Sequence, residues 1–198
     1  MKSEYPFHTA FLFLFMAVVG VRLYYHGFAD AASGVRQHMK GEGSFRVIRI
    51  CLGGPLFAAF IAYMIWPPWM AWSQLPMDPN VRWLGVPFGI ACFFMLRWVH
   101  RHLSRNFTGT VQIRPQGHVV TTGPYRYIRH PMYIAFLLLT ASIFFLTANW
   151  FLGGGILVIF LMVMFVRLSI EERALEAAYG EEYRKYKAKT GAFFPRIF

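Results

Sequence analysis

Residues 117–133, with the sequence GHVVTTGPYRYIRHPMY, form the stretch that decides how this chain folds and acts. The stretch holds three tyrosines, two arginines and two prolines between an apolar run that ends near Leu103 and another that begins at Ile134. Pro131 fits the first turn of a helix, and it biases the residue before it, His130, to an extended backbone. We therefore expect His130 to lie at the mouth of the helix that follows.

The composition around this stretch indicates an integral membrane protein. The chain of 198 residues is 57% hydrophobic and only 15% charged, with a mean hydropathy of +0.41. A soluble domain of this size needs more charge to cover its surface. The chain has a net charge of +11, and its basic residues lie beside the apolar runs and do not form one tract. That placement is typical of loops that face anionic lipid, and it argues against nucleic acid as a partner.

Five apolar runs predict five transmembrane helices, because several of them are long enough to cross about 30 Å of hydrocarbon. The runs cover residues 7–23, 47–66, 83–103, 134–148 and 150–168. Only Asn149 separates the last two, which predicts a helical hairpin, and residues 169–189 read as a C-terminal helix. We expect an all-α membrane fold with one domain. Residues 1–103 would hold three helices, and residues 104–198 the hairpin and the catalytic region.

The distribution of lysine and arginine predicts the orientation. Only two of the twenty, Lys2 and Arg82, lie in the N-terminus or the 67–82 link. The positive-inside rule then places the N-terminus outside, and the C-terminus and the 104–133 segment in the cytoplasm. The first run could instead be a cleaved signal peptide. Cleavage would leave the basic 26–49 loop outside, so we expect a retained helix, in the inner membrane of a prokaryote.

Two groups of side chains on this cytoplasmic side could carry chemistry. Tyr125 and Tyr133 offer aromatic faces to a purine ring or a cation. Arg167 and Glu171 lie one turn apart on the same helix face. From the residues alone, the tyrosines could equally be interfacial anchors, and Arg167 with Glu171 a surface ion pair. The sequence shows no Rossmann fingerprint, phosphate loop, Ser-His-Asp set or metal-ligand spacing.

A longer set of motifs resembles the isoprenylcysteine carboxyl methyltransferase family over residues 104–198, and related membrane phospholipid N-methyltransferases share part of it. The motifs are Gly123-Pro124-Tyr125, Arg129-His130-Pro131-Met132-Tyr133, Arg167 with Glu171-Glu172, Tyr179-Gly180-Glu181-Glu182-Tyr183, Tyr186 and Pro195. The resemblance implies a multi-span membrane enzyme that uses S-adenosyl-L-methionine without a Rossmann domain. The loop before the RHP-x-Y helix and the C-terminal helix would enclose the cofactor pocket.

The resemblance also implies residue roles. Arg167 would bind the substrate carboxylate. The cofactor contacts would be Gln112, Gly117, His118, Val119, Val120, Tyr125, His130, Pro131, Met132, Tyr133 and Glu171, with no metal. The implied reaction is carboxyl O-methylation of a lipophilic, isoprenylcysteine-like substrate, which yields S-adenosyl-L-homocysteine. The alternative is a phospholipid or small-amine N-methyltransferase of the same fold.

We expect the bilayer and a lipophilic or lipid-modified substrate as partners, without an obligate protein partner. Two further classes are weaker interpretations. A membrane sterol reductase shares a similar C-terminal region, but it should have a longer chain with more basic residues for a nicotinamide cofactor. A transporter should show ionisable groups in mid-membrane and an internal repeat, and neither is evident in the sequence.

Overall fold

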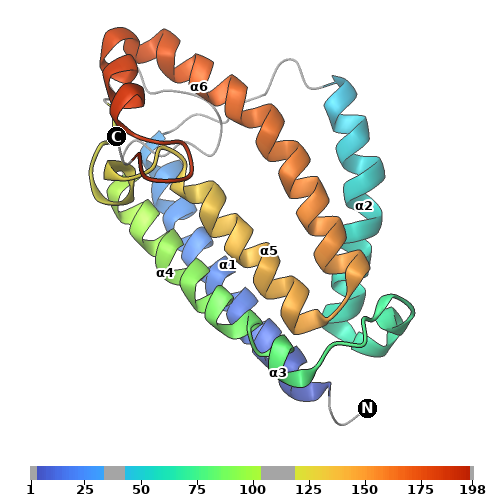
Figure 1. The fold of residues 1–198 in the computed structure, drawn as a ribbon. Helices are drawn as coiled ribbons and strands as arrows, with labels where there is room; N and C mark the ends of the chain where they lie inside the picture. Colours follow the sequence, from blue (N-terminus) through green and yellow to red (C-terminus); the bar gives the residue numbers. More distant parts are fainter. Residues whose placement is uncertain (1–3, 34–42, 104–118, 197–198) are drawn as a thin grey trace.

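The computed structural model describes residues 4–33, 43–103 and 119–196, and all regular elements in these ranges are helices (Figure 1). They are α1 (Tyr5–Ser33), α2 (Gly43–Ile65), η1 (Pro67–Ser73), α3 (Pro79–Arg82), α4 (Gly85–Leu103), η3 (Gly123–Arg126), α5 (Pro131–Thr147), η4 (Trp150–Gly154) and α6 (Gly155–Lys189). The β-type pairing in the described ranges is limited to isolated bridges. The predicted all-α class is confirmed.

Three stretches of helix are long and apolar enough to cross a membrane, namely Tyr5–Tyr25, Pro79–Leu103 and Trp150–Lys189. The apolar helices Gly53–Ile65 and Pro131–Thr147 are shorter. These segments make the chain an integral membrane protein, and the count of five spans stays a prediction. At about 1.5 Å per residue, the 35 residues of α6 exceed the roughly 30 Å of a bilayer core. Its charged C-terminal part therefore extends beyond the hydrocarbon.

Close packing of α4 on α5 forms the centre of the bundle, with α1 alongside (Figure 1). The Ser142 hydroxyl donates to the Gly85 carbonyl oxygen at 2.7 Å. A Cβ atom at Gly85 would lie only 2.8 Å from the Ser142 carbonyl oxygen and 2.6 Å from Leu146 Cγ. Small residues allow this approach, which membrane helices use in place of a hydrophobic driving force.

The α5–α6 hairpin is present, and a buried amide holds its turn. Ala148 adopts φ 46°, and Asn149, which is 1% exposed, accepts a hydrogen bond from the Leu152 amide at 2.9 Å. The Asn149 amide group donates to the Met70 carbonyl oxygen at 3.0 Å and to Ser73 Oγ at 2.8 Å. These bonds satisfy polar groups that would otherwise be costly to bury, and they attach the hairpin to η1.

A second polar cluster joins three elements at the same end. The Arg82 guanidinium forms two bonds with the Glu4 carboxylate, at 2.6 and 2.9 Å, and donates to the Leu146 carbonyl oxygen at 2.8 Å. It also lies over the Phe7 ring, 3.9 Å from the centroid. Arg82 is only 4% exposed, so the pairing compensates its burial.

At the other end of the bundle, α6 continues past the membrane and then turns. The sequence predicts a separate helix over residues 169–189, whereas the structure has one element from Gly155 to Lys189 with non-helical angles at Gly180 (φ 50°). Glycine adopts this φ without steric cost. Beyond Gly180 the chain returns over the ends of α4 and α5, where the C-terminus lies (Figure 1).

We predict that Gly85→Ala lowers the melting temperature of the detergent-purified protein. The added methyl would press on the α5 backbone, and overpacking of this kind costs about 1–3 kcal/mol. Gly20→Ala is the matched control, because a Cβ there meets nothing within 4 Å. Thermal unfolding followed by circular dichroism should show a drop for Gly85→Ala alone. Equal melting temperatures for the two variants would contradict the packing argument.

Candidate active site

The site begins at the first turn of α5, as the sequence predicts. Pro131 is the first helical residue, and His130 is the N-cap with φ −123° and ψ 57°. His130 is 4% exposed, although its side chain does not cap the helix. The preceding turn is also where Gly123-Pro124 predicts one, as η3. The proline therefore fixes where α5 starts and buries the imidazole beside it.

The carboxylate of Glu172 in α6 contacts several basic side chains around this turn. Its Oε1 accepts from Arg129 Nη2 at 2.8 Å and Nε at 3.1 Å, and it lies 3.3 Å from His130 Nε2. Its Oε2 pairs with Lys187 Nζ at 2.8 Å. The side chains of Arg129 and Glu172 are 11% and 17% exposed. Burial opposes ionisation, but the bonds from Lys187 and Arg129 hold the pKa of Glu172 at about 2, so the carboxylate is charged at neutral pH.

Arg129 also forms hydrogen bonds with the residues at the end of α6 and after it. Arg129 Nη1 donates to the carbonyl oxygens of Lys187, at 3.3 Å, and of Thr190. The backbone amide of Arg129 donates to the Gly191 carbonyl oxygen at 2.8 Å, and that of His130 to the Ala192 carbonyl oxygen at 3.1 Å. The residues after α6 thus lie against the entry to α5, although the two segments are far apart in sequence.

The contacts of Arg129 and Glu172 with the C-terminal segment form a clamp. Next to this clamp, Tyr133 and Glu171 are in direct contact. The Tyr133 hydroxyl donates to Glu171 Oε2 at 2.9 Å, and Arg167 approaches the same hydroxyl. Within the described ranges Arg167 and Glu171 form no ion pair. In these ranges Glu171 therefore bonds to Tyr133 and not to Arg167. Phe193 completes an aromatic wall, with its ring centroid 6.1 Å from that of His130 and 6.4 Å from that of Tyr133.

The other predicted contacts fall around this core or outside the described residues. Tyr125 is half-buried, and burial together with the charge of Glu171 raises the pKa of its phenol. Its carbonyl oxygen accepts from the Tyr186 hydroxyl at 2.6 Å. Pro131 and Val119 are buried, and Met132 and Val120 are half-buried. Gln112, Gly117 and His118 lie outside the described residues.

The surroundings of His130 favour the neutral form of its imidazole. Burial lowers its pKa, and this effect outweighs the carboxylates of Glu171 and Glu172. A neutral ring beside a carboxylate donates its Nε2–H, so Nδ1 keeps a lone pair. His130 therefore offers an acceptor, and not a positive charge, to anything bound beside it.

Arg129, Glu172 and Lys187 are site residues whose pairing the sequence argument missed. The residues are visible in the RHP-x-Y motif, in the EER triplet and in the basic tail. Their association across 43 residues between Arg129 and Glu172 depends on how α6 returns over α5. Helical spacing reports neighbours three or four residues apart, so it could not reveal this contact.

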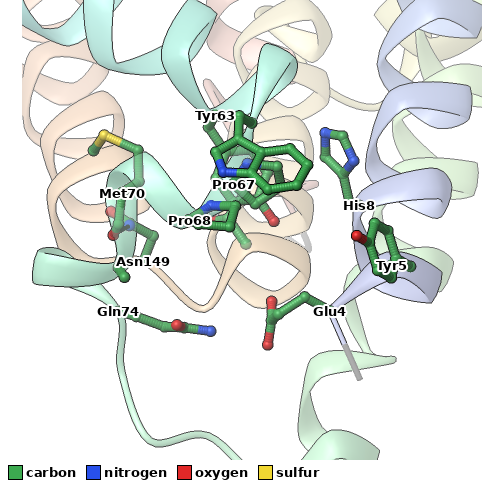
Figure 2. A pocket seen from close by; sticks show the side chains of 12 residues that line it. Glu4, Tyr5, His8, Tyr63, Pro67, Pro68, Met70, Gln74 and Asn149 are labelled. Carbon is green, nitrogen blue, oxygen red and sulfur yellow. Dashed lines mark hydrogen bonds between the residues drawn. The ribbon is translucent and has the colours of Figure 1, made fainter. Parts of the chain in front are cut away.

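A cavity of about 180 Å³ lies at the opposite end of the bundle, beside the hairpin turn (Figure 2). Glu4, His8, Tyr63 and Asn149 are among the side chains that line it. The hydroxyls of Tyr63 and Thr147 are buried at its wall without a hydrogen-bond partner among the described residues, an arrangement that ordered water satisfies in many proteins. This cavity is separate from the predicted cofactor site.

These features define an all-helical integral membrane protein with a cluster of charged and aromatic groups where the C-terminal segment meets a membrane helix. The model of the isoprenylcysteine carboxyl methyltransferase (ICMT) family matches residues 85–177. The predicted resemblance to this family is thereby confirmed. The matched range begins in α4, earlier than the expected residue 104, and it ends before the Tyr179 motif.

A solved structure has the same fold. It is the eukaryotic intramembrane Ras methyltransferase ICMT, and the likeness has a TM-score of 0.58 at 17% identity. It covers 95% of this chain and 68% of that chain. The helices outside the family-matched range, including α1 and α2, therefore belong to the shared architecture as well.

Two curated proteins match part of the sequence. Methanethiol S-methyltransferase 1 of Bradyrhizobium diazoefficiens is 32% identical over 71 residues, which are 36% of this chain and 24% of that protein. Cobalt-zinc-cadmium resistance protein CzcN of Cupriavidus metallidurans is 31% identical over 84 residues, 42% of this chain and 38% of that protein. The matches thus span well under half of either relative.

We predict that Arg129→Gln loosens the C-terminal segment. The variant removes the guanidinium that bridges Glu172 and the Lys187 and Thr190 carbonyl oxygens. Hydrogen exchange should accelerate in peptides that carry the amides of residues 129 and 130, measured by mass spectrometry in detergent. Arg184→Gln is the control, because Arg184 is 67% exposed and forms only an i,i+3 pair with Glu181. An unchanged exchange rate in Arg129→Gln would contradict the role of Arg129 in holding the C-terminal segment.

Proposed function

We propose that the chain is a membrane methyltransferase that uses S-adenosyl-L-methionine to methylate a lipophilic acceptor, and that the reaction is carboxyl O-methylation. The observation that carries the proposal is the Tyr133–Glu171 contact of 2.9 Å, because it joins two predicted cofactor residues from different helices. The family match over residues 85–177 and the ICMT-like fold support it. The similarity to methanethiol S-methyltransferase 1 supports it as well.

The described side chains fit this cofactor chemically. Glu171 uses one carboxylate oxygen for Tyr133, so the other is available to an ammonium group. The neutral His130 ring offers a lone pair at Nδ1. The rings of Tyr133 and Phe193 present electron-rich faces to a cation, an attraction of about 0.5–2 kcal/mol. When bound, S-adenosyl-L-methionine supplies a sulfonium methyl group, which an acceptor lone pair takes as the carbon–sulfur bond breaks.

The chain's own contribution is positioning and exclusion of water. A carboxylate is already a nucleophile at neutral pH, so no general base is required, and proximity with alignment supplies the rate. Arg167 beside the Tyr133 hydroxyl would hold the acceptor carboxylate. An amine acceptor would need a base and would be repelled by the guanidinium, so the N-methylation alternative fits this position less well. A thiol acceptor fits better, because a nearby cation favours the thiolate.

The clamp around Glu172 has a supporting role in this proposal. It holds the C-terminal segment, with Phe193, over the first turn of α5, and so it closes one side of the site. With the predicted orientation the site would face the cytoplasm, where the cofactor is made. The acceptor's apolar part would remain in the bilayer, beside the lipid-exposed face of α6.

Binding of S-adenosylhomocysteine to the detergent-purified protein tests the proposal. We expect wild type to bind, and Glu171→Ala and His130→Ala each to weaken binding about tenfold or more, as for loss of a hydrogen bond to a charged group. Isothermal titration calorimetry gives the dissociation constants. Glu181→Ala is the control, because Glu181 is an exposed carboxylate on the same helix. An absence of binding to wild type would exclude the methyltransferase assignment.

A further inference from the structure

A second arginine, Arg22 in α1, lies near the aromatic side chains of the site. Its Nη1 atom is buried and has no hydrogen-bond partner among the described residues. Its guanidinium lies over the Phe136 ring of α5, 5.0 Å from the centroid. Arg22 belongs to a segment that is apolar and long enough to cross a membrane, where an unsatisfied cation is costly unless it has a function.

Arg22 faces another cation. The positive charge of Arg167 acts on it directly. In the described part of the chain neither arginine forms an ion pair with a carboxylate. Glu171, the nearest carboxylate of the site, accepts its bond from Tyr133. The two positive charges therefore act on each other, and no carboxylate of the described residues pairs with either of them.

The surface that joins the two arginines is aromatic and belongs to the site. Tyr133, which Arg167 approaches, and Phe136, which Arg22 covers, lie almost one turn apart on α5. Phe160 of α6 contacts both, with ring centroids 6.4 Å from Tyr133 and 6.2 Å from Phe136. An acceptor held between the arginines would thus have apolar walls on one side and the Tyr133–Glu171 contact on the other.

We propose that Arg22 and Arg167 together bind the anionic group of the methyl acceptor, so that the acceptor is a lipophilic carboxylate or thiolate. The proposal rests on the proposed function, since it assigns the acceptor side of the same site. An anion between the two guanidinium groups removes their repulsion and satisfies the orphan Nη1. Guanidinium groups suit this task because they stay charged and bind oxyanions with two parallel bonds. An amine offers neither benefit.

The test is equilibrium binding of oleate, with methyl oleate as its uncharged counterpart, to the full-length protein in a neutral detergent. We expect wild type to prefer oleate and Arg22→Met to lose that preference, about tenfold in affinity for the loss of one charged bond. Arg22→Lys should retain part of it. Arg97→Met is the matched control, because Arg97 is exposed near the end of the neighbouring helix α4.

Two outcomes would overturn the proposal: equal binding of oleate and methyl oleate by wild type, or the same loss in Arg97→Met as in Arg22→Met. If Arg22→Met does not fold, then Arg22→Lys and the wild-type preference decide the matter. S-adenosylhomocysteine binding is measured in parallel. It should be unchanged in Arg22→Met, so its absence in wild type would defeat the proposed function while the anion test stands by itself.

The two anion classes are separated by their products. Incubation with methyl-labelled S-adenosylmethionine and either oleate or dodecanethiol would yield a methyl ester or a methyl thioether. Either product supports the anionic acceptor and identifies its class. Methylation of dodecylamine in preference to both would contradict it.

Discussion

The arrangement of the site depends on the ion pairs and hydrogen bonds that the Glu172 carboxylate makes. It binds Arg129, His130 and Lys187 at once, and so it joins the start of α5, the extension of α6 and the end of the chain. Arg129 and Lys187 would repel each other without it. Because the pair with Arg129 is largely shielded from solvent, removing one partner would leave the other charged and buried, which costs far more than a surface ion pair.

The far end of the hairpin is organised on the opposite principle. There the amide of Asn149 makes neutral hydrogen bonds to η1 and to its own turn, and the single ion pair at Arg82 is covered by the Phe7 ring. Neutral bonds of this kind fix the turn where α5 and α6 begin to diverge (Figure 1). Asn149 fixes the turn of the α5–α6 hairpin, and Glu172 fixes its other end. The two helices are therefore aligned so that Tyr133 of α5 lies beside Glu171 of α6.

How far the sequence predicts this structure can be seen residue by residue. Pro131 and Asn149 act locally, through backbone angle and turn formation, and the helix start and the hairpin lie where these residues place them. Tyr133 and Glu171 were connected only through family resemblance. Arg129 and Glu172 appeared only as members of two separate motifs, and the pair of Glu172 with Lys187 also requires the turn at Gly180. A glycine within a helical pattern does not indicate in which direction the chain turns after it.

The position of Arg22 changes what the N-terminal helices contribute. The family match covers only residues 85–177, and by sequence the first two helices carry no recognisable signal. In the structure α1 packs along α4 and α5 and carries a guanidinium to the aromatic surface next to Arg167. Cofactor recognition can then reside in α5, α6 and the C-terminal segment, while α1 contributes to the choice of acceptor. Under the proposal above, the acceptor would meet charge from two sources, Arg167 inside the matched range and Arg22 from a helix outside it.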